Sequence, residues 1–223
     1  MSAEKASAWE VICYLTRLFG GSSIGRKVLM AITGLGLAGF LIFHLIGNSF
    51  LLKGEAAFNA YAKLLHSIPL LPVIEIGLGV FFLAHVVMGI ILTYQNFRAR
   101  PVAYQVKATA GNATVASRSM IYTGSAILVF ITYHLWSLNA GSLPNETPWL
   151  RVQSILTNPV SITIYAAGFL ALGTHLFHGF SSILVTFGLR HRRHDALVDL
   201  LCRAGAFVLA LGYASLAFYF FLK

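Results

Sequence analysis

The chain has 223 residues, of which 57% are hydrophobic and only 10% charged, and its mean hydropathy is +0.77. This composition excludes an ordinary soluble domain and is typical of an integral membrane protein. The formal net charge of +9 does not indicate nucleic-acid binding, because the Lys and Arg residues fall between apolar stretches rather than on one basic face. The length suits about five membrane helices with short connections, which leaves no room for a soluble catalytic domain.

Residues 1–21 are expected to form a cytoplasmic segment ahead of the first membrane helix. Trp9, Ile12, Leu15 and Phe19 recur at helical spacing, which predicts a short helix on the membrane surface. A frayed polar terminus is the alternative. Charged residues near the start, and no short apolar core followed by a small-residue cleavage site, argue against a signal peptide.

The first membrane span lies in the apolar stretch 22–52. The 25 residues between Lys27 and Lys53 would form roughly 38 Å of helix, longer than the ~30 Å that a bilayer core requires. Ser22 or Ser23 can cap this helix. Small residues inside it favour close helix packing, or leave room for a flat group: Gly34, Gly36 and Gly39.

Four further apolar stretches predict four further spans, so that residues 22–223 form an all-α bundle of five transmembrane helices. Pro159 is a good first-turn residue for the fourth span. Residues 149–158, which precede it, are expected at the membrane interface. The fifth span has no internal His and is expected to seal the bundle. The expected helices are about 27–52, 72–97, 120–138, 159–189 and 200–222.

The positions of the basic residues predict the orientation of the bundle. Twelve of the 16 Lys and Arg residues fall on the side of the amino terminus, which leaves four on the other side: Lys53, Lys63, Arg151 and Lys223. Basic loops stay on the cytoplasmic side of a membrane. We therefore expect a multi-pass protein of the cytoplasmic (inner) membrane with a cytoplasmic amino terminus.

Four successive spans each carry a histidine: His44, His85, His134 and His175. A single His on an apolar helix is usually a satisfied core residue, but an imidazole inside a bilayer must be paired, hydrated or metal-bound. Two imidazoles that face each other across a bundle can hold the iron of a b-type haem without covalent attachment. Four such residues predict two haems.

The depth of each histidine suggests how the four pair. His44 is 9 residues from Lys53 and His134 is 10 from Pro144, which places both roughly 14 Å from the outer ends of their helices. His85 is 13 residues from Pro72 and His175 is 16 from Pro159, which places them roughly 20 to 24 Å deep. We therefore expect an outer haem and an inner haem, with ligands His44 and His134, and His85 and His175.

Other residues near these positions have open roles. His178, one turn beyond His175, is an equally good inner ligand by geometry alone. Cys13 and Cys202 form no CxxC or CxxCH motif, so they indicate neither a zinc site nor covalent haem attachment. Several basic residues are placed either to meet haem propionates or simply to anchor the cytoplasmic face: Arg26, Lys27, Arg118, Arg190 and Arg192.

The segments FHLIGN, EAAFNAYAKLLHSIPLLPVIEI, AHVVMG, TYHLW and THLFHGFSSILVTFG resemble the single-chain cytochrome b anchor of succinate:quinone oxidoreductases and fumarate reductases. The resemblance covers residues 22–222. It implies five helices and two haems b, with helix one paired to three and helix two to four. It also implies His175 rather than His178 as a ligand, since His175 stands four residues before Gly179.

The same resemblance implies partners and quinone sites. The partners would be a flavoprotein and an iron–sulfur subunit, within a complex that can form higher oligomers. Menaquinone, rather than ubiquinone, is expected at an outer site near Glu75, His66 and Lys63, although Glu75 can equally be a plain helix-start acid. An inner site is suggested by a group at the head of the first helix: Ser23, Arg26 and Lys27.

The sequence therefore predicts the anchor subunit of a succinate dehydrogenase, which passes electrons between an iron–sulfur partner and membrane quinone and does not itself touch succinate. Two alternatives remain. One is the cytochrome b subunit of a hydrogenase or formate dehydrogenase. The other is a transporter or scaffold whose histidines hold no haem.

Overall fold

The computed structural model describes residues 21–98, 119–140 and 146–223. The expected interfacial helix before residue 21 lies outside this part of the chain. Within it every long element is a helix, and five helices are long and apolar enough to cross a membrane. The prediction of an all-α bundle with five membrane spans is thus confirmed.

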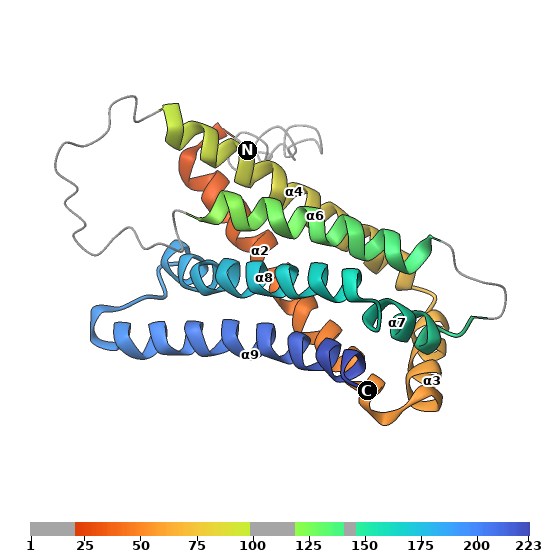
Figure 1. Cartoon of the computed structure of the whole chain (residues 1–223). Coiled ribbons are helices and arrows are strands. Elements are labelled where there is room, and N and C mark those ends of the chain that lie inside the picture. Colours follow the sequence, from red (N-terminus) through yellow and green to blue (C-terminus); the bar gives the residue numbers. More distant parts are fainter. Residues whose placement is uncertain (1–20, 99–118, 141–145) are drawn as a thin grey trace, which may run out of the picture.

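The five long helices run side by side along one direction (Figure 1). The two short helices α3 (Glu55–His66) and α7 (Pro148–Leu156) and the carboxyl terminus lie together at one end, which we call the outer end. The start of the first long helix and the loop between the last two lie at the other, inner end. The long helices are α2 (Ser23–Asn48), α4 (Leu71–Arg98), α6 (Met120–Asn139), α8 (Pro159–Thr186) and α9 (Asp195–Phe221).

Local capping explains where the structure differs from the expected helix ends. The first helix begins four residues before Lys27, because the Ser22 hydroxyl accepts a hydrogen bond from the Gly25 amide at 2.9 Å. The fourth helix ends at Thr186 rather than 189, since Gly188 takes a left-handed φ of 69° that stops it. The fifth begins at Asp195 rather than about 200, with that acid in its first turn, where the helix dipole favours negative charge.

The connector between the first two spans, where the sequence analysis predicts no helix, folds into helix α3. Its partner at the outer end is α7, in the segment expected at the membrane interface. Two hydrogen bonds join them: the Thr147 hydroxyl donates to Glu55 at 3.0 Å, and the Trp149 amide donates to Asn59 at 3.0 Å. The outer end of the bundle is thereby closed by two short helices that support each other.

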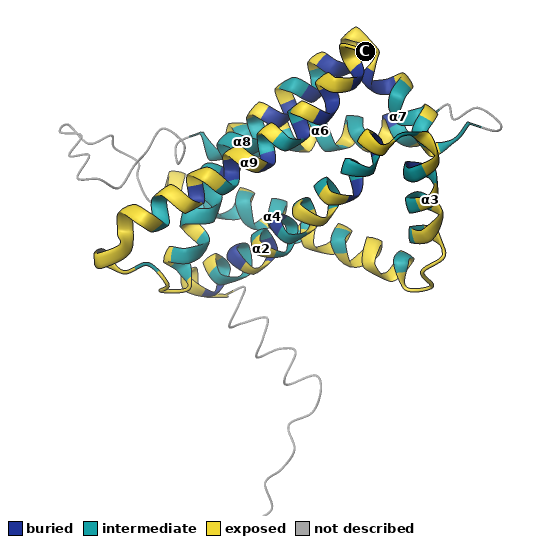
Figure 2. Ribbon diagram, turned by 90° about the horizontal axis from the view of Figure 1, so that it is seen from below, coloured by how far each residue is buried: buried dark blue, intermediate teal, exposed yellow. Residues whose placement is uncertain are grey.

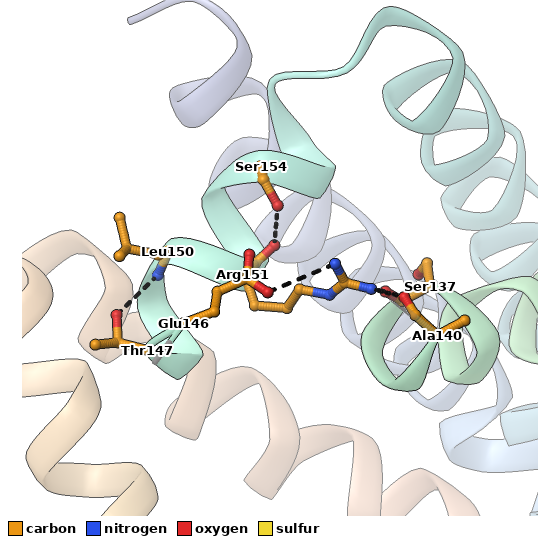
Figure 3. Close-up of polar contacts among 7 residues, drawn as sticks. All are labelled: Ser137, Ala140, Glu146, Thr147, Leu150, Arg151 and Ser154. Carbon is orange, nitrogen blue, oxygen red and sulfur yellow. Dashed lines mark hydrogen bonds and ion pairs between the residues drawn. The ribbon is translucent and has the colours of Figure 1, made fainter. Parts of the chain in front are cut away.

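Arg151 fastens this outer cap to the end of α6. Its guanidinium donates to the carbonyl oxygens of Ser137 and Ala140, which the end of that helix leaves without helical partners, and pairs with Glu146 at 3.7 Å (Figure 3). A cation near a helix carboxyl terminus is also favoured by the helix dipole. Arg151 therefore holds α7 against α6.

Most of the buried residues lie on α8 and α9, as Figure 2 shows. One core cluster lies in the outer half of the bundle and includes Leu156, Phe169, Tyr213 and Phe220. By contrast, α4 has no fully buried residue. Apolar side chains cover the outside of every span, as a lipid-facing surface requires.

Candidate haem-binding site

Two pairs of histidines face each other inside the bundle. His44 on α2 faces His134 on α6, with ring centroids 6.1 Å apart and ring planes at 87°. His85 on α4 faces His175 on α8, with centroids 6.2 Å apart and planes at 65°. We call these the outer pair and the inner pair. The structure thus brings together the same four residues that the sequence singled out, in the expected combination.

The donor chemistry and spacing of each pair fit a haem iron. An iron bound at about 2 Å to one nitrogen of each of two opposed imidazoles would set the ring centroids roughly 6 Å apart, close to the separations in both pairs. In the described ranges, no three His, Cys, Asp or Glu side chains gather to hold a bare metal ion. Two opposed imidazoles are the ligands that the chain would offer to a haem iron, whose other four ligands would be the nitrogens of its own ring.

A single cavity of about 2540 Å³ reaches both pairs and is lined mainly by apolar side chains. Pockets for one drug-sized ligand hold roughly 300–1,000 Å³, so this space accommodates more than one large flat group. Lys27 and Arg190 line it at the inner end, and His66 and Arg151 line it at the outer end. The cavity therefore runs through most of the bundle along the helices.

Small and hydroxyl-bearing residues surround the inner pair. The Thr33 hydroxyl lies 3.2 Å from Nδ1 of His85, and the Thr123 hydroxyl lies 3.1 Å from Nδ1 of His175. The next residue in each helix is a glycine. A Cβ at Gly34 would come within 3.2 Å of the His85 ring, and one at Gly124 within 3.5 Å of the His175 ring. These glycines let each imidazole pack directly on the neighbouring helix.

Aromatic residues surround the outer pair. The Tyr165 hydroxyl lies 2.9 Å from Nδ1 of His134, and Phe40 stacks on His44 with centroids 5.1 Å apart. The ring centroid of Tyr213 on α9 lies 6.0 Å from that of His44, and the Tyr213 hydroxyl donates a hydrogen bond to the Leu41 carbonyl at 2.6 Å. The last helix therefore takes part in the outer site as well as sealing the bundle.

The remaining histidines of the expected site lie nearby without forming a facing pair. His178 lines the cavity one turn beyond His175, but the ring opposite His85 is that of His175. His66 ends α3 and lines the outer end of the cavity. His191 lies in the loop before α9, where its ring accepts a hydrogen bond from the Arg193 amide.

The basic residues expected near haem propionates divide into two groups. Lys27 and Arg190 line the cavity, whereas Arg26 is not among its lining residues. Arg190 donates to Ser181 and to Asp195, and the bond to Asp195 raises the pKa of its guanidinium, so the residue stays charged. Arg118 and the side chain of Arg192 lie outside the described part of the structure.

Arg203 is a cavity-lining cation that the sequence reasoning did not select. Its guanidinium lies 5.1 Å from the centre of the Phe177 ring and pairs with Asp199. In a fifth helix that starts near 200, this residue would lie in the first turn. The start at Asp195 instead puts it in the third turn, where it lines the cavity.

Only some of the candidate quinone residues line the cavity. Glu75 and His66 line the outer end of the cavity, and Lys63 does not. At the inner end Lys27 lines it, while Ser23 and Arg26 do not. Ser22, not Ser23, caps α2. The cavity therefore brings together Glu75 and His66 but does not gather the whole inner group.

An internal repeat is the sequence signal that could have found the hydroxyl partners of the histidines. The chain from α2 to α4 matches the chain from α6 to α8 at a constant offset of 90 residues, without gaps, and the short helices α3 and α7 correspond as well. The residues shared at this offset are Met30 and Met120, Thr33 and Thr123, Gly34 and Gly124, Phe40 and Phe130, His44 and His134, Leu45 and Leu135, Pro69 and Pro159, Ile74 and Ile164, His85 and His175, Gly89 and Gly179, and Phe97 and Phe187.

The repeat gives the paired sites a simple origin. Each histidine faces its own counterpart from the other half, as expected for two similar halves related by a pseudo-two-fold axis. Tyr165, which contacts His134, corresponds to Glu75 at this offset. The two halves therefore share their inner site and differ at the outer one.

Fold and site together define a multi-pass helical membrane protein with two histidine pairs in its core. Comparison with known proteins agrees with this class. The chain is similar to the succinate dehydrogenase cytochrome b558 subunit of Bacillus subtilis (strain 168), at 30% identity over 151 residues, which cover 67% of this chain and 72% of the relative. No protein-family model matches the chain, and no solved structure matches it. The chain belongs to the family of succinate dehydrogenase cytochrome b subunits.

Proposed function

We propose that this chain is a two-haem cytochrome b that anchors a succinate dehydrogenase in the membrane and carries electrons between an iron–sulfur partner and quinone. The observation that supports it most is the presence of two facing histidine pairs, one toward each end, along a single cavity. Kinship with a succinate dehydrogenase subunit supports the same assignment.

The chain's own residues would hold the two haems in fixed positions. His44 and His134 would bind the outer iron, and His85 and His175 the inner iron. When bound, haem b supplies at each level an iron that takes up and gives back one electron. Hydroxyl groups beside three of the four imidazoles fix the ring orientations. Most of the lining around both levels is apolar.

Basic groups at the inner end would neutralise the propionates of the inner haem. Lys27 and Arg190 line the cavity there, and Arg203 adds a third cation. Charge-assisted hydrogen bonds from Arg or Lys to a carboxylate are shorter and stronger than neutral ones. Arg190 already donates to Asp195, so it would share its guanidinium between that acid and a propionate.

The outer end is the better-supported quinone site. Glu75 and His66 both line the cavity there, within reach of a headgroup beside the outer pair. A carboxylate next to a quinone can take up or release the protons that accompany its oxidation or reduction. We propose menaquinone as the quinone. At the inner end, Lys27 lines the cavity without the serine expected beside it.

The proposed partners are the flavoprotein and the iron–sulfur subunit of succinate dehydrogenase, on the cytoplasmic side with the amino terminus. In the described part of the chain, the inner helix ends carry Arg26, Lys27, Arg98, Arg190, Arg192, Arg193 and Arg203, and the outer ends carry Lys53, Lys63, Arg151 and Lys223, which supports this orientation. The complex can associate further into higher oligomers. A cytochrome b of hydrogenase or formate dehydrogenase would use similar histidines, but the relative named above favours succinate dehydrogenase.

Purification of the affinity-tagged chain from its own membranes tests this function. We expect a flavoprotein and an iron–sulfur protein to co-purify, and succinate to reduce the haem absorbance of the preparation within the turnover time of the complex. Co-purification of a hydrogenase or formate dehydrogenase large subunit, with haem that hydrogen or formate but not succinate reduces, would contradict the proposal. A colourless preparation would favour a transporter or scaffold.

A further inference from the structure

Two threonine hydroxyls at the inner pair, one buried and one half-buried, have the geometry to control the histidines they contact. Thr33 is only 2% exposed, and its Oγ1 lies 3.2 Å from Nδ1 of His85. Thr123 has its Oγ1 3.1 Å from Nδ1 of His175. In both cases 52 residues separate the threonine from the histidine. The same contact thus occurs twice, once in each half of the repeat.

The direction of the threonine hydrogen bonds fixes which ring nitrogen carries the proton. The Thr33 hydroxyl donates to the carbonyls of Leu29 at 2.9 Å and Met30 at 3.1 Å. Its single proton is therefore used, and only its lone pairs remain for His85. A carbonyl oxygen cannot donate, so in this arrangement the Thr33 hydroxyl is the acceptor and His85 donates the proton on its Nδ1.

Thr123 repeats this arrangement. Its hydroxyl donates to the Ser119 carbonyl at 3.0 Å and the Met120 carbonyl at 3.2 Å, which leaves its lone pairs for Nδ1–H of His175. In both rings the unprotonated nitrogen is then Nε2. A neutral imidazole binds a metal through its unprotonated nitrogen.

We propose that Thr33 and Thr123 are positioning residues for the inner haem: each accepts the Nδ1–H of its histidine, presents Nε2 to the iron, and makes the imidazole a stronger electron donor. This inference rests on the proposed haem-binding function. An imidazole that donates its second N–H becomes more basic. A more basic ligand stabilises ferric iron, so the two threonines lower the reduction potential of the inner haem.

The outer pair lacks this arrangement, which makes the effect specific to one haem. There Tyr165 lies beside His134, and within the described ranges the ring of His44 has no hydrogen-bond partner. The half of the repeat that contains His44 has Glu75 in place of the tyrosine. Loss of a threonine hydroxyl should therefore shift the reduction potential of the inner haem and leave that of the outer haem unchanged.

The test is a redox titration of purified protein in which Thr33→Val and Thr123→Val are compared with the unaltered chain. Valine keeps the shape of threonine and removes the acceptor. The expected effect is a fivefold to tenfold shift of the inner haem toward the reduced form, which is about 40 to 60 mV at roughly 59 mV per tenfold change. Both variants should raise the reduction potential of the same haem, and the double variant should raise it by about the sum of the two single changes.

Matched variants separate positioning from packing. Thr33→Ser keeps the hydroxyl and should keep the potential. Thr132→Val removes an exposed hydroxyl that bonds only to the Leu128 carbonyl of its own helix, and it should change neither haem. The inference would be overturned if a valine variant changed the reduction potential of the outer haem, of both haems or of neither. An equal change of potential in Thr33→Ser would overturn it as well.

Haem content measured on the same samples keeps this inference distinct from the proposed function. Unaltered protein without two haems contradicts the proposed function itself. Unaltered protein with two haems, and threonine variants with unchanged potentials, contradicts only the role of the threonines. If a valine variant binds less haem, the potential of the fraction that remains still decides the question.

Discussion

Replacement of His175 by alanine is expected to remove the inner haem and leave the outer one. His175 faces His85 at 6.2 Å between ring centroids, and no other described histidine ring lies opposite His85. With one ligand lost, the haem content should fall from two to about one per chain. A redox titration should then show one step in place of two, with the remaining step near its original potential.

His178→Ala is the matched control, because His178 lies one turn away on the same helix and lines the same cavity. It should retain both haems and both redox steps. If His178→Ala loses a haem and His175→Ala keeps two, the assignment of the inner ligand is wrong. This comparison separates the two residues that helical spacing alone left equivalent.

A larger residue at Gly168 is expected to damage the outer site. A Cβ added there would lie 2.5 Å from the Phe130 ring and less than 3 Å from two further atoms of that ring. Phe130 in turn packs against His134 and Tyr165, with ring centroids 5.9 Å and 5.2 Å away. Gly168→Leu should destabilise the fold by about 1–3 kcal/mol and reduce outer haem occupancy, as measured by haem content after purification.

Gly77→Leu provides the control for this variant. A Cβ at Gly77 meets no atom within 4 Å, on a helix without fully buried residues. Its haem content and thermal stability should match those of the unaltered chain. Equal losses in the two variants would mean that added bulk in any span disturbs the bundle, and the role assigned to the Phe130 contact would then be wrong.

Much of the architecture could be predicted because membrane helices are recognisable in the sequence as long stretches of high hydropathy. Long apolar stretches that start and end at charged or proline residues allow few alternatives in a bilayer, where backbone groups must be satisfied within a helix. The depth of His44 and His134, measured from Lys53 and Pro144, was enough to predict that these two face each other. Hydropathy thus predicted the spans, and the depths of the histidines within the spans predicted their pairing.

The errors lie where polar contacts outweigh hydropathy. Helix α3 lies in a stretch with many polar residues, so its packing against α7 through Asn59 and Trp149 left no hydropathy signal. The early start of α9 at Asp195 depends on a first-turn acid and its contact with Arg190. Apolar periodicity does not record polar contacts, whether they join residues 90 apart, as Asn59 and Trp149 are, or five apart, as Arg190 and Asp195 are.

The residues around the histidines were missed for a different reason. Thr33, Thr123 and Tyr165 are ordinary helix residues whose spacing to a histidine becomes meaningful only when two helices are placed side by side. The 90-residue repeat does record this spacing, since each contact recurs in both halves or is replaced at one equivalent position. A comparison of the chain with itself would have selected these residues.

The most direct test of the central claim is a redox titration of the reduced-minus-oxidised haem spectrum of the purified chain, with haem quantified per chain. The account predicts two b-type haems and two separate one-electron steps, one for the pair His44 and His134 and one for the pair His85 and His175. One haem with a single step would mean that one pair is structural. No haem at all would contradict the account entirely.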